Sequence, residues 1–257
     1  LNVSKIQNHL KSEDVISTIN CLRKLGVKIS KKKGILFVKG KGLGSLYAKK
    51  NTKLNFGNSG TLARLLIGIL STTPNIELNL AGDSSLNKRS MKKLITIMTK
   101  FGASFKPKNK FKFPLKIISS PYPIGLNYKA GVSAQLKSAV MFAALNSYGK
   151  TNIFEKAKSR DHTERMLQHN KKLIKIRKQK GTKLIEILGK KELKSLKFKI
   201  FGDPSSAAFF CALTTINKGS SLKILNVGVN PTRIGFYQLL NKFGAKIKFV
   251  NFRKNNN

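Results

Sequence analysis

The chain has 257 residues, 40% of them hydrophobic, which is enough for one large domain or two smaller ones and excludes a disordered chain. Lysine and arginine number 51 against 10 acidic residues, giving a formal net charge of +41. No apolar stretch reaches bilayer-spanning length and nothing resembles a secretory signal, so we expect a cytoplasmic protein with no membrane partner.

Three segments share one pattern, an amphipathic helix that ends in glycine and continues as a strand. They are residues 21–29, 97–103 and 239–247, with glycines at Gly26, Gly102 and Gly244. Glycine suits the left-handed position that follows a helix. The glycines are 76 and 142 residues apart, which leaves room for a degenerate copy near residues 166–176. We therefore expect a fold assembled from repeated α/β units.

Other elements follow from hydrophobic periodicity. We expect strands at 76–80, 115–118, 183–188 and 222–225, and helices over 90–101 and 133–145. The second helix is rich in alanine and suits tight burial. The fold class is α/β with repeated βαβαββ-type units, and a boundary near residue 200 divides it into a first domain, 1–199, and the beginning of a second, 200–257, which is incomplete.

The two cysteines, Cys21 and Cys211, lie in apolar helix-like segments. They lack the spacing of metal ligands and have no evident reason to pair. We expect both to be reduced core residues.

Residues 57–64, Gly-Asn-Ser-Gly-Thr-Leu-Ala-Arg, are the strongest candidate for an anion site. The glycines allow a ligand to approach the backbone, and Asn58, Ser59 and Thr61 can cap the following helix. The first N–H groups of a helix lack internal partners, so a phosphate or carboxylate binds there readily. A capped helix after a tight turn is the alternative interpretation.

Arginine is scarce, with eight of the 51 basic residues, so its placement is informative. Five arginines fall in motif-like segments, where they can bind carboxylate or phosphate with two parallel hydrogen bonds: Arg64, Arg89, Arg160, Arg165 and Arg233. The lysines instead are spread along the chain without interleaved aromatics. A solvated, lysine-rich surface is thus favoured over a nucleic-acid groove.

Several ordered segments, taken together, resemble the 5-enolpyruvylshikimate-3-phosphate synthase family (3-phosphoshikimate 1-carboxyvinyltransferases) over essentially the whole chain. They are 57–64, 82–91, 133–139, 157–167 and 202–208 with 230–233. The resemblance implies transfer of the enolpyruvyl group of phosphoenolpyruvate to the 5-hydroxyl of shikimate 3-phosphate, a step toward chorismate and aromatic amino acids. It also implies a monomer, no metal or organic cofactor, and an inside-out α/β barrel in two domains.

The resemblance assigns substrate-binding roles by position. Asn58, Gly60 and Thr61 match the loop that meets phosphoenolpyruvate, where the inhibitor glyphosate competes, and glycine at position 60 implies sensitivity to it. Arg89 matches the arginine that clamps phosphoenolpyruvate, although Ser90 replaces the proline that usually follows. The remaining matches, Ser133, Ala134, Gln135 and Arg160, imply contacts with shikimate 3-phosphate, with Gln135 reaching between both substrates.

Neighbouring polar residues have structural interpretations. Asp161 and Glu164 suit partners of Arg165 at a helix start, and His162 suits a structural role. Arg64 and Lys137 suit either ligands or buried pairing residues. Asp83 and Asp203 follow glycines and suit helix caps.

The family's Lys-Ser segment would lie before Leu1, and its catalytic Asp and Glu after Asn257, so we expect a sequence truncated at both ends, with no catalytic residue of its own and no turnover alone. A related enzyme that uses UDP-N-acetylglucosamine is an alternative, but its loop cysteine is absent, and Ser-Arg-Asp-His-Thr-Glu at 159–164 fits the shikimate branch better. A basic nucleic-acid-binding module is the non-enzymatic alternative.

Overall fold

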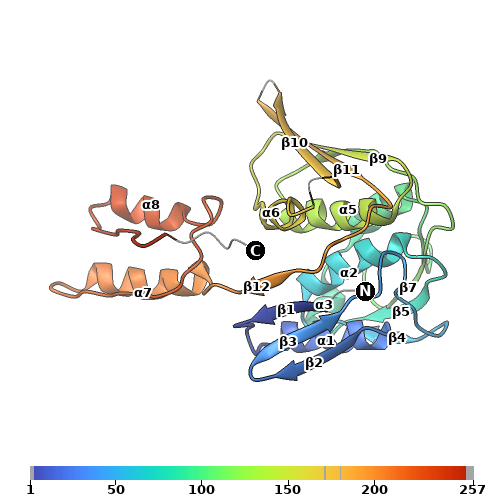
Figure 1. The fold of residues 1–257 in the computed structure, drawn as a ribbon, viewed down its shortest axis with the longest axis horizontal. Coiled ribbons are helices and arrows are strands. Elements are labelled where there is room, and N and C mark those ends of the chain that lie inside the picture. Colours follow the sequence, from blue (N-terminus) through green and yellow to red (C-terminus); the bar gives the residue numbers. More distant parts are fainter. Residues whose placement is uncertain (1–2, 171, 180, 253–257) are drawn as a thin grey trace.

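The computed structural model describes residues 3–170, 172–179 and 181–252. Three four-stranded sheets lie on the outside of the larger part of the molecule, with helices between them (Figure 1). Two further helices, α7 (Pro204–Ile216) and α8 (Gly235–Lys242), extend to one side. The expected α/β class is confirmed.

The repeated unit is clearest in residues 53–118. Its elements are β4 (Lys53–Asn55), α2 (Gly60–Thr72), β5 (Glu77–Ala81), α3 (Ser84–Lys88), α4 (Lys92–Lys100), β6 (Ser104–Lys106) and β7 (Leu115–Ile118). The strand order is β4-β5-β7-β6, and only β4 and β5 are parallel. The strands expected at 76–80 and 115–118 and the helix expected over 90–101 are therefore present.

A second unit has the same topology. It comprises β8 (Asn127–Ala130), α5 (Ala134–Asn146), β9 (Lys150–Glu155), α6 (His162–Leu167), β10 (Ile174–Gln179) and β11 (Thr182–Leu188). The order β8-β9-β11-β10, with β8 and β9 parallel, repeats that of the first unit. The sequence repeat thus corresponds to a structural one. Residue 171, in the expected degenerate copy, lies outside the described residues.

The third sheet joins the two ends of residues 3–199. It is built from β1 (Val3–Gln7), β2 (Lys28–Lys32), β3 (Ile35–Lys39) and β12 (Lys197–Lys199), with α1 (Glu13–Lys24) between β1 and β2. The order is β12-β1-β3-β2, and β12 lies parallel to β1. The sheet that contains β1, β2 and β3 is therefore completed by β12, a strand from far along the chain.

Helices α2 and α5 form the centre of the core. Gly68 of α2 lies against Ala139 of α5, so close that a Cβ at Gly68 would meet the Ala139 carbonyl oxygen at 2.5 Å. Thr72 Oγ1 donates to the Ala143 carbonyl at 3.1 Å. Because α5 presents alanines, the two helix backbones approach closely, as its sequence predicts.

The three repeat glycines adopt the expected left-handed conformation, with φ of +81°, +92° and +93° at Gly26, Gly102 and Gly244. The strand predicted at 222–225 is wrong, and no strand follows Gly244 in the described residues. Among the described residues 200–252, β-pairing is limited to an isolated bridge between Gly202 and Val227. A strand needs a neighbour to satisfy its backbone groups, and the periodicity of one segment does not supply it.

The cysteines differ from one another. Cys21 is buried, as expected, and burial raises the pKa of its thiol to about 11. Cys211 is only half-buried, so its assignment to the core is wrong. Its helix α7 exposes Phe209 and Phe210 by 79% and 61%.

Candidate functional site

The loop before α2 is organised by Ser59. Ser59 is the N-cap, and its hydroxyl accepts a hydrogen bond from the Leu62 N–H at 3.2 Å. Gly57 has a φ of +57° and allows the chain to turn into the helix. Because Ser59 caps the helix, the side chains of Asn58 and Thr61 are available for other contacts.

Asn58 binds Arg89 at the end of α3. Arg89 Nη2 donates to Asn58 Oδ1 at 2.7 Å and to Ser85 Oγ at 3.3 Å. Asp83 caps the start of α3 by accepting from the Leu86 N–H at 2.7 Å, in agreement with its expected role. The arginine thus lies beside the loop with its guanidinium held by neutral oxygens.

A second guanidinium, that of Arg64, lies on the same side of the loop. Arg64 Nη1 donates to the Gly60 carbonyl at 2.9 Å. A Cβ at Gly60 would stand 2.7 Å from Arg64 Nη1 and 3.3 Å from Arg89 Nη1. Burial, and next the charge of Arg89, lower the pKa of Arg64.

Two like charges so close are mutually unfavourable unless an anion lies between them. In the described part of the chain, neither Arg64 nor Arg89 forms an ion pair with a carboxylate. Carboxylate and phosphate groups match the planar guanidinium fork. This end of α2 is therefore suited to bind an anionic ligand.

The start of α5 lies beside the start of α2. Gln135 Nε2 donates to Thr61 Oγ1 at 2.7 Å. Ser133 is the N-cap of α5 and accepts from the Leu136 N–H at 3.4 Å, and Ala134 is the first helical residue. Contacts therefore connect Asn58, Gly60, Thr61, Arg89 and Gln135, with Ser133 and Ala134 next to Gln135.

Arg160 differs from the other candidate residues. It is exposed and directly precedes Asp161, the N-cap of α6, and no described hydrogen bond or ion pair joins it to the residues around Gly60. Its neighbour His162 has a lowered pKa, because of burial and then the charge of Arg233, with Arg160 and Arg165 adding to the effect. Arg160 thus belongs to a separate basic group at the start of α6.

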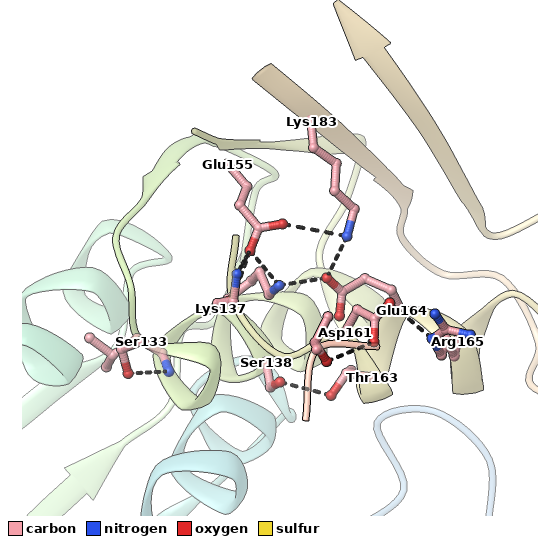
Figure 2. A network of polar contacts seen from close by, with 12 residues as sticks. Ser133, Lys137, Ser138, Glu155, Asp161, Thr163, Glu164, Arg165 and Lys183 are labelled. Atoms are coloured by element: carbon pink, nitrogen blue, oxygen red, sulfur yellow. Dashed lines mark hydrogen bonds and ion pairs between the residues drawn. The ribbon is translucent and has the colours of Figure 1, made fainter. Parts of the chain in front are cut away.

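A buried ion cluster connects α5, α6, β9 and β11 (Figure 2). Lys137 Nζ lies 2.7 Å from Glu155 Oε1 and 2.6 Å from Glu164 Oε1. Lys183 Nζ lies 3.4 Å from Glu155 Oε2 and 3.1 Å from Glu164 Oε1. Lys137 is 0% exposed, so the alternative of a buried pairing residue applies to it.

The predicted pairing of Glu164 with Arg165 is wrong. Arg165 Nε binds Asp161 Oδ2 at 2.9 Å, as expected for Asp161, whereas Glu164 points into the buried cluster. Sequence reasoning did not identify Glu155 or Lys183. The available signal was Glu155 at an alternating buried position of β9, since an acid there needs a cationic partner.

Among residues 3–170, 172–179 and 181–252, no group of three or more His, Cys, Asp or Glu residues is arranged to hold a metal ion. In the same residues, no helix is long and apolar enough to cross a membrane.

Comparisons with known proteins identify the family. Residues 2–256 match the family model of EPSP synthase (3-phosphoshikimate 1-carboxyvinyltransferase). The 3-phosphoshikimate 1-carboxyvinyltransferases of Syntrophomonas wolfei and Caldicellulosiruptor bescii are 42% and 43% identical, over 97% and 99% of this chain. The chain covers 57% and 58% of these two relatives, a little over half of their length.

Solved structures agree with the sequence matches. EPSP synthase from Acinetobacter baumannii superposes with a TM-score of 0.85 at 32% identity, and the alignment covers 98% of this chain and 56% of that one. The match supports the inside-out α/β fold that the resemblance implies. The chain belongs to the EPSP synthase family.

Proposed function

We propose that the protein carrying this chain transfers the enolpyruvyl group of phosphoenolpyruvate to the 5-hydroxyl of shikimate 3-phosphate and releases phosphate. The observation that best supports this proposal is the pair of guanidinium groups of Arg64 and Arg89. They meet at Gly60 with no described carboxylate between them. Membership of the EPSP synthase family supports the same reaction. The relatives' names do not favour the UDP-N-acetylglucosamine alternative or a nucleic-acid-binding module.

The site residues have distinct proposed roles. Phosphoenolpyruvate binds Arg89 and the loop of Asn58, Gly60 and Thr61. Shikimate 3-phosphate binds Ser133, Ala134 and Arg160, and Gln135 lies between the two substrates. The hydrogen bond from Gln135 to Thr61 supports this arrangement, because it joins a residue proposed to lie between the substrates to the proposed phosphoenolpyruvate loop.

Three further properties form part of the proposal. Residues 1–199 form one domain and 200–257 belong to a second, since the three sheets lie within 3–199. The protein is a cytoplasmic monomer. Its reaction needs no metal or organic cofactor, because guanidinium groups and helix N–H groups supply the charge that binds both anions.

Calorimetric titration of this chain with shikimate 3-phosphate, followed by phosphoenolpyruvate, tests the proposal. We expect binding of both, and loss of most shikimate 3-phosphate affinity in Gln135→Ala. A phosphate-release assay of the protein carrying the chain, with shikimate 3-phosphate and UDP-N-acetylglucosamine as rival acceptors, decides the reaction. Activity with the sugar nucleotide alone, or salt-sensitive DNA binding without affinity for shikimate 3-phosphate, would overturn it.

A further inference from the structure

Asp161 occupies the N-cap position of α6, yet its side chain accepts no capping hydrogen bond from the backbone N–H groups of that helix. The aspartates at the same position of α3 and α7 behave differently. Asp83 accepts from the Leu86 N–H, and Asp203 accepts from the N–H groups of Ser205 and Ser206. An N-cap aspartate whose side chain makes no capping hydrogen bond is available for another contact.

That contact is with residues 230–232. Asp161 Oδ1 accepts from Asn230 Nδ2 at 2.7 Å and from Thr232 Oγ1 at 3.4 Å, while Oδ2 faces Arg165 Nε at 2.9 Å. Burial raises the pKa of Asp161, but hydrogen bonds from Asn230 and Arg165 outweigh it and leave the pKa below its ordinary value. The carboxylate therefore stays charged at neutral pH.

The turn that meets Asp161 is itself well ordered by hydrogen bonds. Asn230 Oδ1 accepts from the Thr232 N–H at 2.9 Å, and the Asn230 carbonyl accepts from the Arg233 N–H at 2.8 Å. Arg233 Nη2 then binds Asp203 Oδ1 at 2.6 Å, at the start of α7. The turn is therefore bonded to the start of α7.

Asp161 joins the two proposed domains. In the described residues, the side-chain to side-chain hydrogen bonds between 3–199 and 200–252 both end on Asp161 Oδ1. The remaining hydrogen bonds between these parts involve the backbone of Ile200, at the crossing of the chain. Asp161 is therefore placed to couple the position of residues 200–252 to that of residues 3–199.

The other side of α6 is fixed to α5. Glu164 binds Lys137, and Ser138 Oγ lies 2.7 Å from Thr163 Oγ1 (Figure 2). Lys137 is one turn after Ser133, so these contacts link α6 to the proposed substrate-binding turn of α5. Arg160 immediately precedes Asp161, the N-cap of α6.

We infer that Asp161 is a positioning residue, which holds the turn 230–233 against the start of α6 and fixes the backbone from which Arg160 meets the phosphate of shikimate 3-phosphate. The inference rests on the proposed function. It assigns Asp161 neither a proton transfer nor a substrate contact. Its effect is to make substrate affinity depend on residues of both proposed domains.

The test is a double-mutant cycle of Asp161→Ala, Asn230→Ala and their combination, with calorimetric titration by shikimate 3-phosphate. Each single variant should weaken binding about tenfold, as for one lost hydrogen bond to a charged group. The double variant should weaken it no further, because both changes break the same contact. Asp161→Asn keeps an acceptor and should restore most of the affinity. Asp14→Ala, an exposed acid of α1, is the charge-matched control.

Amide hydrogen exchange gives a readout that simple loss of stability would not reproduce. The Arg233 N–H should exchange faster in Asp161→Ala, while the melting temperature stays within a few degrees of wild type. Should Asp161→Ala fail to fold, Asn230→Ala makes the same test from the other side. The inference is overturned if the wild type binds shikimate 3-phosphate and each single variant binds it with an affinity within twofold of wild type. It is also overturned if the losses of affinity add in the double variant. Absence of wild-type binding instead overturns the proposed function together with it.

Discussion

Ala139 in α5 lies directly against Gly68 in α2, with its carbonyl oxygen 2.5 Å and its Cα 2.8 Å from where a Gly68 Cβ would stand. The two helices begin with the proposed site residues, Gly60 and Thr61 on one and Ala134 and Gln135 on the other. Their close packing therefore sets the distance between the two proposed subsites.

Gly68→Ala should push α5 away from α2. Backbone atoms of Ala139 cannot move aside as a flexible side chain would, so we expect a loss of about 1–3 kcal/mol in the free energy of unfolding. Urea denaturation measures it. Gly131→Ala is the control, because a Cβ there has no atom within 4 Å, and it should change stability by less than about 0.5 kcal/mol. Equal stability of the two variants would show that the helices can separate freely.

Lys137→Met should be strongly destabilising. It leaves Glu155 and Glu164, 3% and 1% exposed, with one cation instead of two. Breaking a buried pair on one side costs about 3–5 kcal/mol. Lys150→Met breaks an exposed pair with Glu186 and should cost about 1 kcal/mol or less. Comparable losses in the two unfolding curves would contradict the buried character of the cluster.

Glu155 should make stability depend on pH. Burial raises its pKa, but hydrogen bonds from Lys137 and Ser159 outweigh this and lower it below the ordinary value. The stabilisation is therefore complete above the unfolded-state pKa of about 4.3 and is lost as pH falls through the lower folded-state pKa. Urea midpoints between pH 6 and pH 3 should converge for wild type and Glu155→Gln at the acid end.

Parallel pH curves for wild type and Glu155→Gln would contradict that prediction. Glu13→Gln, at an exposed position in the first turn of α1, is the matched control. Its curve should follow wild type across the same range.

Gly60→Ala should weaken anion binding. Its Cβ would stand 2.7 Å from Arg64 Nη1 and 3.3 Å from Arg89 Nη1, so both guanidinium groups must shift. With shikimate 3-phosphate present, we expect affinity for phosphoenolpyruvate and for glyphosate to fall by about tenfold, as for one charge-assisted hydrogen bond. Calorimetry measures both, with Gly131→Ala as control. Undiminished glyphosate binding in Gly60→Ala would refute this account of the loop.

Local signals made much of the fold predictable. Gly26 and Gly102 each follow a helix and have a left-handed backbone conformation. This conformation strongly favours glycine, so it can be recognised in the sequence. The strand proposed at 222–225 was wrong because pairing depends on distant partners. The pattern of one segment cannot reveal whether a neighbour is present.

The candidate site divides in the same way. The loop 57–64 is evident from its glycines and capping residues, which are close in sequence. The bond between Asn58 and Arg89 spans 31 residues, and that between Asp161 and Asn230 spans 69. Such contacts depend on how separate units pack. The type of a residue therefore predicts that it makes a polar contact, but not which residue is its partner.

The parallel pairing of β12 with β1 has a consequence for synthesis on the ribosome. Ser4 and Leu196, joined by a hydrogen bond beside this pairing, are 192 positions apart. The other two sheets come from contiguous stretches and can assemble as they emerge, whereas β1 must wait with an open edge. We therefore expect β1 to find this neighbour only after β12 has been synthesised, and an interrupted nascent chain would expose that edge to other polypeptides.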